Sequence, residues 1–204
     1  DGTELAKGPA PVLSDEIHCD FAMFGNKHTI FPSISKEFEQ NCIWCTSPSK
    51  TFNIAGLQTS NIFVPNPALK KRFTASMAAT GYMHPNICGL AAAHAAFQYG
   101  GEWYEGLIEH LEGNIRCLGQ TLKQSIPEVK LVEPDGTFLM WLDFRALGLS
   151  DDALNEMLRT EAGVWMNQGV AFGQEGSGFM RMNVACPRPL LEEALRRIEK
   201  AIHQ

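Results

Sequence analysis

The chain has 204 residues, of which 45% are hydrophobic and 20% charged, and its formal net charge is −6. This length and this hydrophobic fraction are enough for a hydrophobic core and for one or two domains. The acidic balance argues against a nucleic-acid-binding protein, because phosphate contacts need a basic face and the densest basic run is KKR at 70–72. No apolar run reaches the roughly 20 residues of a membrane span, and the N-terminus lacks a signal-peptide pattern. We therefore expect a cytoplasmic protein whose partners are small molecules or copies of itself.

Short apolar runs bounded by polar or turn residues predict three strands in the first half of the chain. They are PVLSDEI at 11–17, CIWCTS at 42–47 and SNIFVP at 60–65. Such runs are typical of strands that are covered on both faces of an α/β sheet. Helical patterns follow over 67–77 and 85–99, and a glycine pair at 100–101 separates them from a long amphipathic helix predicted over 102–125.

In the second half, short strands alternate with helices. The runs that predict strands lie at 129–134, 136–144, 163–169 and 178–186. Helices are predicted over 150–162, where Ser150 is a suitable N-cap, and over 188–203, which opens with prolines. A small sheet packed against helices is an α+β arrangement, so we predict an α/β domain over 1–100 and an α+β domain over 101–204.

The cysteines include one C-x-x-C motif, formed by Cys42 and Cys45. In other settings this motif marks a redox pair or half of a zinc site. No second C-x-x-C and no histidine pair lies at ligand spacing in the sequence. We therefore predict free, mostly buried thiols and no metal site.

Two polar segments, SDEIH at 14–18 and SPSK at 47–50, come at the ends of the first two predicted strands. Open α/β sheets bind ligands at the carboxyl ends of their strands. There a desolvated Lys50 would have a lowered pKa and could attack an aldehyde as an amine nucleophile. An aldehyde cofactor would be pyridoxal 5'-phosphate (PLP), and Asp15 is a candidate for the acid that its ring nitrogen needs. The alternatives are a solvated surface lysine and an aspartate that caps a turn.

Further polar residues suit the same cofactor and its substrate. The hydroxyl groups of Thr46, Ser47 and Ser49, with nearby backbone N–H groups, could bind a phosphate. Arg181 could bind the α-carboxylate of an amino acid with its planar fork of donors. Its alternative role is an ion pair with a surface acid.

The motifs together resemble those of the class I/II aminotransferase family of fold-type I PLP enzymes. The segments that carry the resemblance are VLSDEIHCDF, HTIFPSIS, TSPSKTFNIAGLQTSNI, GTFLMWLDFR and GQEGSGFMRMNVACPR, in the family's order. They look most like the MalY/PatB-type branch of cystathionine β-lyases and cysteine C–S lyases. The resemblance runs from about Val12 to the C-terminus. It implies the rest of a PLP-binding large domain with a mostly parallel sheet over 1–100, a small domain over 101–204, and a homodimer.

The resemblance also implies roles for individual residues. Lys50 would be the catalytic lysine that bonds to the cofactor's aldehyde, and Asp15 the partner of the pyridine nitrogen. His18 stands where many relatives have a tyrosine that contacts the phenolic oxygen of PLP. Ser47 falls on a phosphate-contacting position, and Arg181 would bind the substrate carboxylate.

Two departures from the family pattern bear on function. Gln58 stands eight positions after Lys50, where many aminotransferases have a phosphate-binding arginine. Together with His18, this favours a C–S β-lyase that acts on cystathionine or cysteine conjugates and releases pyruvate, ammonia and a thiol. The second departure is length: the chain resembles only the C-terminal half of such an enzyme, so we expect it to hold PLP weakly alone. An amino-acid aminotransferase and a non-catalytic remnant remain the alternatives.

Overall fold

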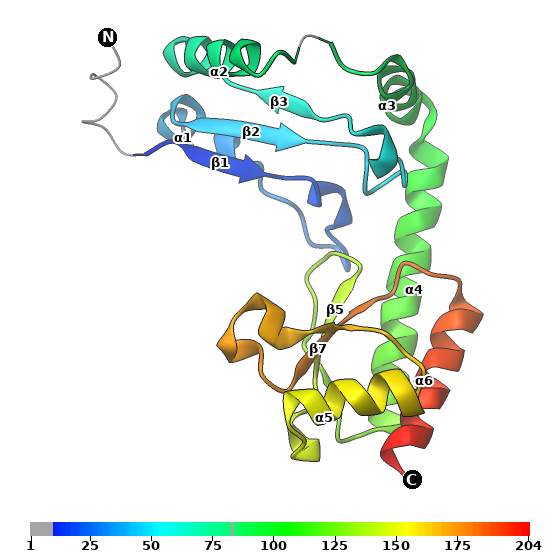
Figure 1. Ribbon diagram of the computed structural model, residues 1–204. Coiled ribbons are helices and arrows are strands. Elements are labelled where there is room, and N and C mark those ends of the chain that lie inside the picture. Colours follow the sequence, from blue (N-terminus) through cyan, green and yellow to red (C-terminus); the bar gives the residue numbers. More distant parts are fainter. Residues whose placement is uncertain (1–9, 83) are drawn as a thin grey trace. The chain divides into compact units, whose positions relative to one another are not determined.

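The computed structural model describes residues 10–82 and 84–204, which divide into two compact units (Figure 1). The first unit contains the residues up to Ala22 together with Lys27–Glu105, and the second contains Met23–Asn26 and Gly106–Gln204. The division therefore falls inside helix α4 (Gly101–Ser125). No helix in the described part of the chain is both long and apolar enough to cross a membrane. The assignment of 1–100 and 101–204 to a large and a small domain stays a prediction.

The first unit contains a three-stranded sheet in the order β1-β2-β3 (Figure 1). Its strands are β1 (Val12–Asp15), β2 (Cys42–Thr46) and β3 (Asn61–Phe63), and its complete helices are α1 (Lys36–Gln40), α2 (Pro67–Ala79) and α3 (Ile87–Tyr99). β1 and β2 are parallel, with Asp15 opposite Cys45. β2 and β3 are antiparallel. The three predicted strands and the helices after them are thus confirmed, but the sheet is mixed.

Local chemistry explains where the two longer helices of this unit begin. The side chain of Asn66 accepts hydrogen bonds from the first-turn amides of α2, and Asn86 accepts one from the Gly89 amide of α3. Pro67 occupies the first turn of α2, where a missing N–H costs nothing. Gly100 then ends α3. Of these features, the sequence pattern indicated only the break at Gly100.

The strands of the first unit are less covered than predicted. Leu13 of β1 is 66% exposed, and Ile62 and Phe63 of β3 are each 44% exposed. β1 and β3 are the two edges of the sheet, and the described residues pack too few side chains on them to exclude water. The prediction that both faces are covered is therefore wrong for these strands in this chain.

The second unit contains an antiparallel sheet in the order β4-β5-β7-β6. Its strands are β4 (Lys130–Leu131), β5 (Leu139–Asp143), β6 (Asn167–Gln168) and β7 (Phe179–Asn183), and its further helices are α5 (Asp151–Glu156), a π-helical turn (Met157–Glu161) and α6 (Arg188–Ile202). Because side chains alternate along a strand, one face of β5 and β7 carries the buried Met140, Leu142, Met180 and Met182. The opposite face carries Trp141 and Arg181, which lie directly across from each other.

Asn114 is a fully buried polar residue that connects α4 to the segment after β7. Its side-chain nitrogen lies 2.8 Å from the carbonyl oxygen of Val184 and 2.9 Å from that of Cys186. Its side-chain oxygen accepts a hydrogen bond of 2.7 Å from Nε of Arg188, the first residue of α6. Asn114 therefore satisfies backbone groups where the chain leaves β7 and enters α6.

We expect Asn114→Ala to lower the free energy of unfolding by about 2 to 4 kcal/mol, because it leaves the Val184 carbonyl and Nε of Arg188 without this partner, while the Cys186 carbonyl keeps its contact with Nε2 of His110. Urea unfolding of the chain followed by circular dichroism measures this loss. The matched control is Gln120→Ala on the exposed face of the same helix, for which we expect a change within about 0.5 kcal/mol. Equal losses for the two variants would contradict the role given to Asn114.

Candidate active site

Lys50 lies in a tight turn that directly follows β2. The amide of Phe52 donates to the carbonyl of Pro48 (2.9 Å) and that of Ile54 to the carbonyl of Ser49 (3.0 Å), so the lysine lies inside two overlapping hydrogen-bonded turns. These bonds fix the backbone on both sides of Lys50, while its side chain is exposed.

The hydroxyl groups of Ser47 and Ser49 are buried beneath this turn. The Ser47 oxygen lies 2.7 Å from that of Ser49 and 2.7 Å from the carbonyl oxygen of Thr59, and it accepts a hydrogen bond from the Ser49 amide. A hydroxyl has a single hydrogen, so Ser47 can donate to Thr59 while it accepts from Ser49. Both serines thus shape the turn, and their contact with a cofactor phosphate stays a prediction.

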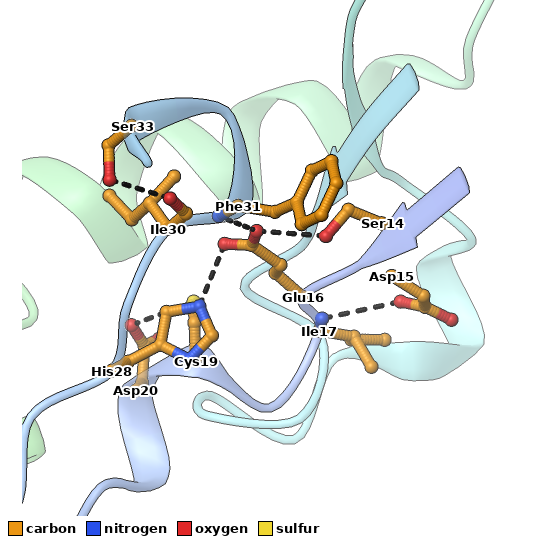
Figure 2. Close-up of polar contacts among 10 residues, drawn as sticks. All are labelled: Ser14, Asp15, Glu16, Ile17, Cys19, Asp20, His28, Ile30, Phe31 and Ser33. Atoms are coloured by element: carbon orange, nitrogen blue, oxygen red, sulfur yellow. Dashed lines mark hydrogen bonds and ion pairs between the residues drawn. The ribbon is translucent and has the colours of Figure 1, made fainter. Parts of the chain in front are cut away.

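Asp15 lies at the end of β1, beside the end of β2. Neighbouring strands lie about 4.8 Å apart, and both strands point the same way, so Asp15 and the turn with Lys50 share one edge of the sheet. One carboxylate oxygen of Asp15 accepts a hydrogen bond of 3.3 Å from the amide of Ile17 (Figure 2). His18 follows, and its ring centroid is 5.8 Å from that of Phe21. The first unit therefore places Asp15 and the turn with Lys50 at one edge of its sheet, and His18 follows three residues after Asp15.

The expected desolvation of Lys50 is not found in this chain. Both Lys50 and Asp15 are exposed. The chain thus provides the amine and the carboxylate but does not enclose them.

Glu16 is a buried carboxylate that the sequence interpretation did not single out. Only 5% exposed, it accepts hydrogen bonds from the Ser14 hydroxyl (3.0 Å) and the Phe31 amide (2.9 Å), and Nε2 of His28 lies 2.8 Å from its other oxygen (Figure 2). Burial raises the pKa of Glu16, but the hydrogen bonds from Phe31, His28 and Ser14 outweigh it, and the net pKa is lowered. Glu16 thereby holds the loop after β1 to the segment 28–31.

The lowered pKa of Glu16 predicts a pH-dependent contribution to stability. Glu16 stabilises the folded chain above the ordinary glutamate pKa of 4.5, and this contribution is lost as the pH falls through the lower pKa of the folded state. We expect the difference in unfolding free energy between wild type and Glu16→Gln to shrink steadily as the pH falls below 4.5. Urea titrations from about pH 7 to about pH 3 measure it. Glu37→Gln, at an exposed acid on α1, is the control. A similar pH trend for this variant would show that the effect is not specific to Glu16.

All six cysteines are free thiols, including Cys42 and Cys45 of the C-x-x-C motif. Burial, and after it the neighbouring acids, raise the pKa of both thiols in the motif. A thiol with a raised pKa is a poor nucleophile and a poor metal ligand at neutral pH. In the described residues no three His, Cys, Asp or Glu side chains gather as metal ligands do.

Arg181 lies in the second unit, on the face of β7 away from the core. Its terminal nitrogen donates to the side-chain oxygen of Asn167 (3.1 Å), and its guanidinium lies 4.5 Å above the ring of Phe172. Nε of Arg181 is buried and has no hydrogen-bond partner among the described residues. Arg145, in contrast, is paired with Asp143 at 2.8 Å. No acid of the described residues pairs with Arg181, so its role as a surface ion pair finds no support, and its donors can face a carboxylate.

Comparison with known proteins places these residues in a family. The model of the family described as aminotransferase class I and II matches residues 3–198. The chain belongs to this family. Proteins similar to this chain include cystathionine beta-lyase PatB of Bacillus subtilis (strain 168), 41% identical over 191 residues, which are 94% of this chain and 49% of that protein. Protein MalY of Escherichia coli (strain K12) is 31% identical over 192 residues, which are 94% of this chain and 48% of that protein.

A solved structure gives the same result for the fold. The structure of cystalysin from Treponema denticola, described as containing a pyridoxal 5'-phosphate cofactor, is 38% identical and has a TM-score of 0.92. The match covers 98% of this chain and 50% of that chain. The predicted family and the α/β fold class are thereby confirmed. The chain spans about half the length of the relatives it matches.

The residues of the first unit fit the cofactor of this class I and II family. The exposed amine of Lys50 can react with an aldehyde, the carboxylate of Asp15 can pair with a protonated ring nitrogen, and the two lie at one sheet edge. Arg181 belongs to the second unit. The sequence interpretation missed the polar contacts around Glu16 and those of Asp20. The only sequence signal for either was the clustering of acids in SDEIHCD.

Proposed function

We propose that this chain is the C-terminal half of a PLP-dependent C–S β-lyase that acts on cystathionine or related cysteine conjugates. The observation that supports PLP as the cofactor is the placement of Lys50 and Asp15 at the ends of two neighbouring parallel strands. The lyase reaction is supported by the 41% identity to a cystathionine beta-lyase. Gln58 supports it as well, because many aminotransferases have a phosphate-binding arginine at that position.

In this proposal the chain's own residues bind the substrate and move one proton. Arg181 binds the α-carboxylate through two parallel hydrogen bonds and thereby sets the orientation of the Cα–H bond. The neutral amine of Lys50 removes the proton from Cα. Bound PLP would supply an electron sink for the charge left on Cα.

The remaining residues hold the cofactor in the proposed site. Asp15 would keep the ring nitrogen protonated by its negative charge. His18 would contact the phenolic oxygen, and Ser47 and Ser49 would bind the phosphate. In the net reaction the Cβ–S bond breaks, the sulfur leaves with its electron pair and is protonated to a thiol, and water converts the remainder to pyruvate and ammonia.

The proposal includes a cytoplasmic homodimer, on the resemblance to the family. The exposed apolar side chains of Leu13, Ile62 and Phe63 are consistent with further polypeptide against the first unit. Light scattering of the full-length protein, meaning this chain with the half that its relatives have in addition, measures the oligomeric state. A monomer at working concentration would contradict the proposed homodimer.

The activity test uses the full-length protein with PLP, cystathionine and S-alkyl cysteines, and measures pyruvate with lactate dehydrogenase. Pyruvate release that depends on Lys50 supports the lyase. Amino transfer to an added keto acid, without pyruvate release, would instead identify an aminotransferase. If neither reaction occurs and PLP gives no absorbance change that Lys50→Ala removes, the protein is a non-catalytic remnant.

A further inference from the structure

Asp20 connects the loop after β1 to the turn that carries Lys50. Its carboxylate accepts a hydrogen bond of 2.6 Å from the hydroxyl of Thr51, the residue that directly follows the lysine. The other carboxylate oxygen lies 3.6 Å from the sulfur of Cys19 (Figure 2). Thr51 is only 2% exposed, so this bond is shielded from water. Hydrogen bonds from a hydroxyl to a carboxylate are short and about twice as strong as neutral ones.

Two side chains in the first turn of α4 donate hydrogen bonds to the backbone carbonyls of the same two residues. The hydroxyl of Tyr104 donates to the backbone carbonyl of Asp20 (2.9 Å), and Nε1 of Trp103 donates to the backbone carbonyl of Thr51 (3.3 Å). The backbones of Asp20 and Thr51 are thus both bonded to one helical turn. With the direct bond between them, this forms a closed set of contacts around the residue after Lys50.

This set of contacts links the residue after the lysine to the segment that carries Asp15. Asp20 belongs to the same short segment as Asp15 and His18, and Thr51 is one residue from Lys50. The lysine side chain is long and flexible, so its reach toward a ligand depends on where its Cα is held. Asp20 itself faces Thr51 and Cys19, and no contact in the described residues turns it toward Lys50's amine.

We propose that Asp20 is a positioning residue that, through Thr51, fixes Lys50 relative to Asp15 and His18. This role rests on the proposed function, because it matters only if Lys50 and Asp15 hold one ligand. Without the bond, the loop after β1 and the lysine turn remain joined by the sheet and by α4 alone. The turn then opens more often, and fewer molecules present the amine in the position for reaction.

The test replaces Thr51 with valine, which has nearly the same shape but no hydroxyl, and with serine, which keeps it. In hydrogen–deuterium exchange without cofactor, we expect the Thr51→Val chain to exchange the amides of Phe52 and Ile54 about 10-fold faster than wild type. In the full-length protein, we expect PLP to bind about 10-fold more weakly, measured by absorbance titration. Thr51→Ser should restore both values to within about 3-fold of wild type.

Control variants distinguish the loss of the Thr51–Asp20 hydrogen bond from general effects of substitution. Thr80→Val removes an exposed hydroxyl at the end of α2 in the same unit and should change neither measurement. Should Thr51→Val fail to fold, Asp20→Asn provides the same comparison, because it keeps the shape and weakens the acceptor. Wild-type exchange and PLP affinity in Thr51→Val would overturn the proposal, and so would a defect that Thr51→Ser does not restore. If wild type binds no PLP, the proposed function fails separately, and the exchange comparison alone decides whether Asp20 fixes the turn.

Discussion

Lys50→Ala in the full-length protein is expected to lower kcat by at least about 10³-fold, since in the proposed function it removes both the amine that would bond to the cofactor and the base that would take the Cα proton. The variant should still fold, because Lys50 is exposed and the bonds of its turn are made by neighbouring backbone groups. Pyruvate release and the visible absorbance of bound PLP measure the two losses separately.

Two further lysine variants make this prediction specific. Lys70→Ala, at an exposed lysine on α2, should retain activity within about 2-fold, since surface substitutions rarely matter. Lys50→Arg keeps the charge, but a guanidinium does not lose its proton in proteins, so it should be as inactive as Lys50→Ala. A Lys50→Ala protein with more than a tenth of wild-type activity would show that another residue takes the proton.

The strands and helices could be predicted because their hydrophobic periods are local. The run GTFLMWLDF alternates in a way that places Met140 and Leu142 on one face and Trp141 on the other, as β5 does. The helix predicted over 150–162 is only partly an α-helix, because α5 gives way to a π-helical turn at Met157. Met157 and Leu158, the first two residues of that turn, are both buried.

The pairing of the strands was harder to predict than the strands themselves. The antiparallel pairing of β3 with β2 depends on the path of residues 47–60, which carry the lysine turn and no hydrophobic period. Burial of β1 was overestimated for a related reason. A sequence run such as VLSD shows that a strand can be covered on both faces, but it does not show which residues of the same chain cover it.

Part of the candidate site could likewise be predicted from the sequence, and part of it could not. Lys50 and Asp15 were found because Asp15 lies at the end of a predicted strand and Lys50 comes shortly after the end of the next one. The bonds from Glu16 to His28 and from Asp20 to Thr51 span 12 and 31 residues through irregular loops. Acids, hydroxyls and histidines are common in loops, so nothing in the sequence marks which of them meet. Contacts of this kind become visible only in three dimensions.

Arg181→Ala is expected to lower kcat/KM of the full-length protein for amino-acid substrates by about 10²- to 10³-fold, mostly through a higher KM. The reason is that the guanidinium has donors left to offer: it is held by Asn167 and packed over Phe172, and no carboxylate of the described residues pairs with it. Arg181→Lys should not restore activity, because an ammonium group cannot donate two parallel hydrogen bonds to a carboxylate.

Arg145→Ala is the matched control for this prediction. Arg145 also lies over an aromatic ring, that of Phe179, but its donors are already bonded to Asp143. Its loss should change kcat/KM by less than about 2-fold, as for other exposed residues. A substrate analogue without the α-carboxylate provides a second check, because Arg181→Ala should then lose its effect relative to wild type. If the variant is equally impaired toward the analogue, Arg181 supports the fold of the sheet and does not bind the carboxylate.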